Sequence, residues 1–153
     1  MPGRDWGRIV LMELAANLVE ERGLEERGLV IMADLPPLTV ATVQGILTGE
    51  ISDQTVNELL WHCLGYRYDP ATGQWDHSRV EPAWREEYPQ PPDFIGSRPA
   101  TVKLTRSIPP QNKQLLKEQL HFEGYQVREL NPRLTRRATA ANWLLSYFRQ
   151  IEE

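Results

Sequence analysis

Hydrophobic residues recur at helical spacing near the start of the chain. Trp6, Val10, Leu14 and Leu18 follow one another every four positions, and Gly23 comes after them as a stop signal. This pattern predicts an amphipathic helix over residues 5–22. The stretch GLEERGLVIMADLPPL comes next and ends in a proline pair, which prevents a helix from running through it. We therefore expect residues 1–34 to form an N-terminal helical extension and residues 35–153 to form a single domain.

Two further helices are predicted on either side of a tight corner. Thr39 is a suitable N-cap for a helix that ends at Gly49, and Ser52 can cap the next. In the second helix the apolar residues stand at i, i+3, i+4, i+7 and i+8, the stripe typical of a core-facing helix. Its members are Val56, Leu59, Leu60, Cys63 and Leu64.

The stretch GYRYDPATGQWD predicts a β-hairpin. Its arms are residues 66–68 and 74–76, and they flank DPATG, in which proline and glycine suit the corner positions of a turn. Tyr66 and Tyr68 share one face, while Trp75 lies on the partner arm. These three aromatics can form a surface that binds a sugar or a base, or they can cover the neighbouring helix and stabilise the hairpin.

Residues 77–99 contain five prolines and are predicted to be a strap within the domain. PAWREEY can form one helical turn, whereas YPQPPDF favours extended backbone. Such a run can be recognised by a partner domain. Alternatively, it can pack on its own domain through four apolar side chains: Trp84, Tyr88, Phe94 and Ile95.

The remainder of the chain predicts a strand-helix-strand-helix unit. ATVKLTR alternates apolar and polar residues, as a strand does, and YQVREL is the second expected strand. A helix between them is expected to start at Pro109 and Pro110 and to end at Gly124. The last helix carries apolar residues at steps of three and four between Leu134 and Ile151. The predicted fold class is α+β, with N-terminal helices, a hairpin and a small sheet.

Charge is distributed unevenly along the 153 residues. Residues 1–93 have a net charge of −9, residues 94–153 have +5, and the whole chain has −4. The region of the second helix and the hairpin is acidic, which argues against a winged-helix contact with DNA there. The single cysteine excludes an intrachain disulfide, and no apolar run reaches the length of a membrane span. We expect a soluble, intracellular protein.

No catalytic, metal or cofactor motif is evident. His62 and Cys63 are adjacent, but neighbours on a helix point about 100° apart, so we expect a solvated histidine and a buried, inert thiol. His62, His77 and His121 have no metal-ligand spacing, and glycines do not cluster into a phosphate loop. We predict no catalytic residues, no metal and no cofactor.

The motif RLTRRATAANW has the sharpest chemical signature. Arg133, Arg136 and Arg137 fall in the first turns of the last helix, where the helix dipole is already positive. Either an acidic side chain of the same chain or an external anion must offset this charge. We expect Arg133 and one of the other two to remain available to a partner, together with Lys103 and Arg106.

Four stretches resemble a family known as a domain of unknown function, found in cyanobacteria and plant plastids. They are WHCLGYRYDPATGQWD, EPAWREEYPQPPDFI, SRPATVKLTRSIPPQNKQLLKEQL and TRRATAANWLLSYF, and the similarity runs from about Leu35 to Phe148. The resemblance implies cyanobacterial cytoplasm or plastid stroma, and it implies no functional residues. The first 33 or so residues depart from the family's pattern.

These observations leave three hypotheses. The first is a non-enzymatic interaction, assembly or regulatory factor that binds an acidic protein surface through its basic C-terminal half. The second is a binder of RNA or a phosphorylated small molecule through the same residues. The third is an enzyme of unfamiliar type.

Overall fold

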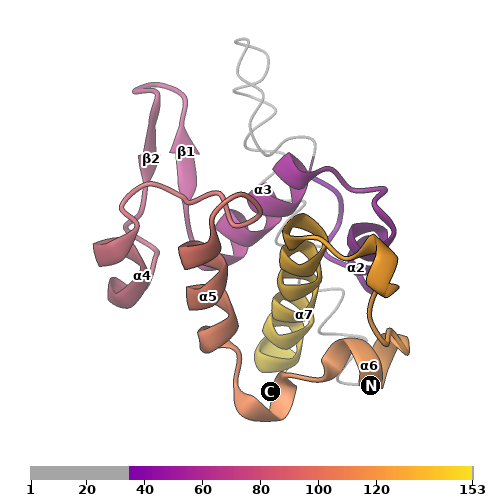
Figure 1. Ribbon diagram of the computed structural model, residues 1–153. Helices are drawn as coiled ribbons and strands as arrows, with labels where there is room; N and C mark the ends of the chain where they lie inside the picture. The colour runs from indigo at the N-terminus through magenta and orange to yellow at the C-terminus, as the bar shows by residue number, and fades with distance from the viewer. Residues whose placement is uncertain (1–34, 153) are drawn as a thin grey trace. The chain divides into compact units, whose positions relative to one another are not determined.

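The computed structural model describes residues 35–152, so the predicted helix at residues 5–22 and the segment after it lie outside the described residues. The order of elements is α2 (Val40–Thr48), α3 (Asp53–Leu64), β1 (Arg67–Asp69), β2 (Gln74–Asp76), α4 (Pro82–Glu87), α5 (Arg98–Ser107), η1 (Pro110–Asn112), α6 (Leu115–Leu120), η2 (Val127–Glu129) and α7 (Pro132–Glu152) (Figure 1). Helices combined with a two-stranded antiparallel sheet confirm the α+β class.

The described chain divides into two compact units, which are treated separately. The hairpin unit comprises residues 35–38 and 58–92. The helical unit comprises residues 39–57 and 93–152. The division falls within α3 and within the predicted strap, and the expectation of a single domain over residues 35–153 stays a prediction.

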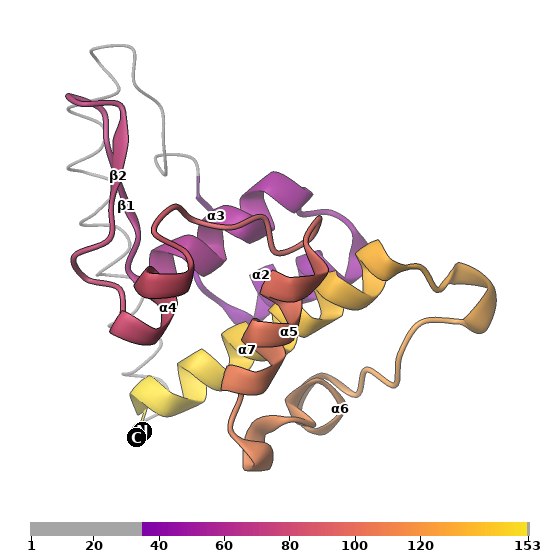
Figure 2. The same ribbon diagram turned by 60° about the vertical axis from the view of Figure 1, so that its left-hand side comes forward.

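The helical unit is organised around α7, which packs against α2, α5 and α6 (Figures 1 and 2). Its length and its small residues explain this position, because Ala140 and Ala141 are fully buried and let neighbouring helices approach closely. The apolar stripe predicted for the last helix is largely confirmed. The exception is Ile151, which is 42% exposed and lies outside the core.

The predicted corner between the first two described helices is confirmed. The Thr39 side chain accepts a hydrogen bond from the amide of Thr42, and Gly49 ends α2 with a φ of 88°. At the start of α3, the Ser52 hydroxyl accepts a hydrogen bond from the amide of Thr55. Both caps satisfy amide groups that the first turn of a helix leaves without an intrahelical partner.

In the hairpin unit, the predicted hairpin is confirmed with Tyr68 opposite Trp75. Pro82 starts α4, as expected for the turn in PAWREEY, and Trp84 of that helix is buried. The Trp61 indole donates a hydrogen bond of 2.6 Å to the carbonyl of Pro92. These contacts show that this part of the strap packs within its own unit instead of extending into solvent.

The strand predicted at ATVKLTR is wrong, because these residues form α5. Ser97 caps the helix by accepting from the amide of Ala100, and a proline in the first turn fixes a helical φ. Ala100, Leu104 and Ile108 stand four residues apart and are all buried. This spacing of four competed with the alternation of apolar and polar residues that suggested a strand, and packing against α7 favoured the helix.

The strand predicted at YQVREL is also wrong. Val127–Glu129 form a single 3-10 turn, in which the Glu129 carboxylate accepts from the amide of Gln126. Val127 is 86% exposed, so the apolar positions that suggested a strand are not covered. The helix expected from Pro109 to Gly124 is shorter than predicted and divides into η1 and α6.

A basic surface and a buried arginine

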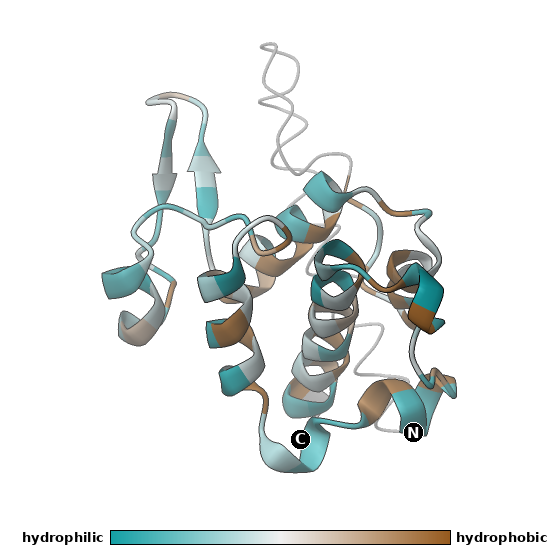
Figure 3. Cartoon of the chain, in the orientation of Figure 1, coloured by the Kyte–Doolittle hydropathy of each residue, from teal (hydrophilic) through white to brown (hydrophobic). Residues whose placement is uncertain are grey.

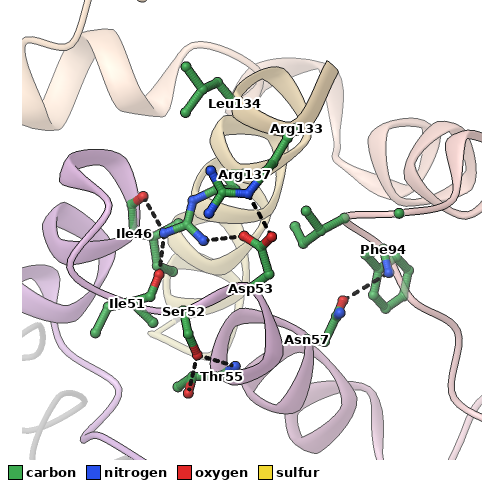
Figure 4. Close-up of polar contacts among 12 residues, drawn as sticks. Ile46, Ile51, Ser52, Asp53, Thr55, Asn57, Phe94, Arg133, Leu134 and Arg137 are labelled. Carbon is green, nitrogen blue, oxygen red and sulfur yellow. Dashed lines mark hydrogen bonds and ion pairs between the residues drawn. The ribbon is translucent and has the colours of Figure 1, made fainter. Parts of the chain in front are cut away.

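Two members of the predicted arginine cluster, Arg133 and Arg137, contact Asp53, the first residue of α3, from the start of α7 (Figure 4). Arg133 Nε lies 2.7 Å from Asp53 Oδ2, and Arg137 Nη1 lies 2.6 Å from Asp53 Oδ1. Asn131 caps the helix by accepting from the amide of Leu134 at 2.9 Å. A single carboxylate from the acidic half of the chain thus binds two of the three guanidinium groups and balances one of their positive charges.

Arg137 is fully buried, which the sequence did not indicate. Its Nη2 donates to the carbonyls of Ile46, at 2.9 Å, and of Ile51. Ile46 lies in the last turn of α2, where carbonyls have no intrahelical partner, and Ile51 lies in the corner before α3. The guanidinium therefore ties the corner to α7, and we leave Arg137 out of any surface for an external partner.

The pKa of Asp53 reflects the same contacts. Partial burial of its carboxyl would raise the pKa, but hydrogen bonds from Arg133 and Arg137, together with their positive charge, hold it below its ordinary value. The ionised form of Asp53 is thus the form that the folded helical unit contains near neutral pH.

Arg136 is half-buried and binds a different partner. Its Nη1 donates to the carbonyl of Ile95 at 3.1 Å, just before α5 begins. This bond uses one of the five N–H groups of the guanidinium, so the others can still bind oxygen atoms of a partner. Arg133 keeps a similar capacity, since its side chain is 55% exposed despite the bond to Asp53.

Lys103 and Arg106 lie on α5 and, being three residues apart, share a face of that helix. Lys103 is half-buried, whereas Arg106 is exposed and has no ion-pair partner within residues 35–152. Other exposed basic residues without such a partner in the same range include Arg98, Lys117 and Arg128. In Figure 3, hydrophilic residues also mark the first turn of α7, where Arg133 lies.

The three aromatics of the hairpin do not form one open surface. Tyr66 is fully buried, and its hydroxyl donates to the carbonyl of Tyr88 at 2.6 Å, so this residue is removed from the predicted aromatic surface. Tyr68 and Trp75 are half-buried and meet edge to face, with ring centroids 5.3 Å apart. Trp75 also meets Trp61 of α3 edge to face at 5.4 Å. This geometry favours the role of covering the helix.

The environments of His62 and Cys63 differ from those that the sequence predicted. His62 is buried, and Cys63 is half-buried. Burial, reinforced by the positive charges of Arg67 and Arg79, lowers the pKa of His62 from 6.5 to about 3. The expected solvated histidine is therefore a neutral core residue. The signal missed was the hairpin directly after α3, whose Arg67 donates a hydrogen bond to the carbonyl of His62.

We expect His62 to make the protein sensitive to acid. Because the folded state keeps it neutral while the unfolded chain protonates it below about pH 6.5, its contribution to stability is complete above that pH and is lost on acidification. By pH 5 the free energy of unfolding should fall by about 2 kcal/mol more in the wild type than in His62→Gln. Urea titrations of both proteins between pH 7.5 and 5 measure this difference, and equal slopes would contradict it.

Residues 35–152 contain no group of three or more His, Cys, Asp or Glu side chains placed to hold a metal ion. None of the helices in that range is both long and apolar enough to cross a membrane.

Comparison with known proteins identifies the family of this chain. Residues 37–149 match the family described as Domain of unknown function (DUF1823), and the chain belongs to this family. A protein solved as a solution NMR structure is 56% identical, with a TM-score of 0.69. The match covers 75% of this chain and 96% of that one. The search of curated proteins gives no match.

Proposed function

We propose that this protein is a non-enzymatic interaction factor, acting in the assembly or regulation of a complex, and that it binds an acidic protein surface through basic residues of its helical unit. The observation that carries the proposal is which of those basic residues are exposed and which already have an ion-pair partner. Although Arg133 and Arg137 are paired with Asp53, Arg106 on α5 is exposed and has no ion-pair partner within the described chain.

The proposed contact surface consists of Lys103 and Arg106 on α5, with the exposed parts of Arg133 and Arg136 on α7. Guanidinium groups bind carboxylates through paired hydrogen bonds, and exposed rim charges mainly increase association rates and favour partners of opposite charge. Arg137 is buried and positions Asp53 by a hydrogen bond. Asp53 in turn binds Arg133 of the proposed surface. The resemblance noted in the sequence supports cyanobacterial cytoplasm or plastid stroma as the proposed compartment.

The test compares charge-reversed proteins with matched controls. Tagged wild type, the Lys103→Glu/Arg106→Glu variant and a Lys117→Glu/Arg149→Glu control are used to capture proteins from a native lysate, with mass spectrometric quantification. Both variants change the net charge equally, and all four positions lie at or near the surface. We expect one acidic protein to be recovered at least ten-fold less with the first variant and undiminished with the control.

Nuclease treatment of the lysate separates this proposal from RNA binding. If recovery depends on RNA, nuclease will abolish it, and affinity will fall steeply with salt according to the number of phosphates contacted. Equal recovery of every captured protein by the wild type and the α5 variant would overturn the proposed surface.

A further inference from the structure

A pocket of about 480 Å³ opens in the helical unit, at a different place from the proposed protein-binding surface. Its walls come from the end of α5, the segment containing η1 and α6, the turn after α6, and α7. The volume falls within the range of roughly 300–1,000 Å³ that small-molecule sites occupy. The lining residues named below all belong to one compact unit.

The apolar part of the pocket is made by Ile108, Leu116, Phe122 and Ala138. Phe122 follows His121, which ends α6 with a left-handed backbone (φ of 55°) and so changes the direction of the chain. Its ring also meets that of Tyr125 edge to face at 5.1 Å. An aromatic ring and aliphatic side chains in a concave site offer apolar surface to the body of a bound molecule.

The basic part of the pocket lies on its α6 side. Lys113 donates a hydrogen bond of 2.8 Å to the carbonyl of Thr105, which holds its ammonium at the end of α5. An ammonium has three donors, so two remain for a ligand. Lys117, one helical turn further on, has no ion-pair partner within the described residues. Glu123 is the one acidic residue among those that line the pocket, so positive charge is in excess.

The α7 side of the pocket presents hydrogen-bond acceptors. Thr135 donates its hydroxyl proton to the carbonyl of Asn131, just before α7, and Thr139 donates to the carbonyl of Thr135, at 3.2 Å in both cases. Their oxygen lone pairs therefore remain available to a donor in the pocket. Asn142 is already engaged, because its side chain bonds to the backbone of Asn112 and Leu116.

We propose that this pocket binds a small organic anion that combines a carboxylate or phosphate group with an apolar body. Lys113 and Lys117 bind the anionic group, and Phe122 with its aliphatic neighbours covers the body. A lysine ammonium binds either anion as a point charge, so both chemistries share one recognition mechanism. This site goes beyond the proposed protein-binding function and uses different residues.

The test is an NMR titration of the full chain, followed through backbone amide shifts. Octanoate represents ligands with a carboxylate, and phenyl phosphate represents ligands with a phosphate. Two half-probes serve as controls: octanol has an apolar body without an anionic group, and inorganic phosphate has an anionic group without an apolar body. We expect saturable shifts at pocket residues with octanoate or phenyl phosphate, and at least ten-fold weaker binding of the two half-probes. Octanol binding as tightly as octanoate, with no phenyl phosphate binding, would overturn the role of the lysines.

Variants then locate the site. Lys113→Gln/Lys117→Gln removes both charges but keeps amide donors, and we expect it to weaken binding of the preferred probe at least ten-fold. Lys103→Gln/Arg106→Gln removes two charges from α5 outside the pocket, and we expect affinity to stay within two-fold of wild type. Ala138→Leu fills the pocket from α7 and should abolish binding in a protein whose thermal unfolding is otherwise normal. If binding survives in a folded Ala138→Leu protein, or if no probe gives saturable shifts, the proposal is wrong.

Discussion

Replacing Arg137 with methionine is expected to lower the free energy of unfolding by about 3–5 kcal/mol, although the change is on a helix exposed to solvent along one side. The guanidinium is fully buried and binds the carbonyls of Ile46 and Ile51 as well as Asp53. Methionine fills much of the volume but offers no donors, so both carbonyls lose a buried hydrogen-bond partner. Chemical denaturation of purified variants measures the loss.

Two comparisons identify the cause. Arg133→Met removes the other bond to Asp53 from a side chain that is 55% exposed, and we expect a much smaller loss of stability. Asp53→Leu combined with Arg137→Met removes both charges. Since the charges are coupled, we expect the double variant to lose less free energy of unfolding than the two single variants lose in sum. Equal effects of Arg133→Met and Arg137→Met would contradict a structural role for the buried guanidinium.

The arginine cluster shows where sequence reasoning succeeded and where it failed. Three positive charges at a helix start predicted that something negative lies opposite, and Asp53 occupies that position for two of them. The sequence could not separate Arg136 from Arg137, because adjacent residues on a helix differ only in the direction in which they point. Which of the two is buried depends on the faces of α7 that pack against α2 and α5, and no local pattern specifies these faces.

Local signals were reliable where local chemistry decides the outcome. The caps at Thr39 and Ser52 and the proline and glycine of the hairpin turn all act within a few residues, and each element formed as predicted. The two wrong strands were predicted from the alternation of apolar and polar residues. Alternation over six or seven residues is compatible with either structure, and in α5 the packing of Leu104 selected the helix. The pocket was not foreseeable, since its walls come from segments that are adjacent only in the folded chain.

Gly65 gives the second prediction with a large effect. It connects α3 to the hairpin with a φ of 111°, a region that residues with a Cβ rarely adopt. A Cβ at this position would also lie 2.6 Å from the carbonyl oxygen of Arg79. Backbone atoms cannot move aside as a flexible side chain can, so Gly65→Ala has to shift the connection itself. We expect a loss of about 3–5 kcal/mol, from backbone strain of roughly 1–3 kcal/mol together with the overpacking.

Gly49→Ala separates the two contributions, because Gly49 has a φ of 88° but open space where its Cβ would be. Only strain acts there, so we expect a loss of about 1–2 kcal/mol. Gly73→Ala, in the hairpin turn with a φ of 72° and its nearest neighbour 3.9 Å away at the Tyr68 hydroxyl, should behave like Gly49→Ala. Thermal and urea unfolding of the three proteins ranks them. If Gly65→Ala is no less stable than the other two, the close approach of Arg79 to α3 is not a feature of the folded protein.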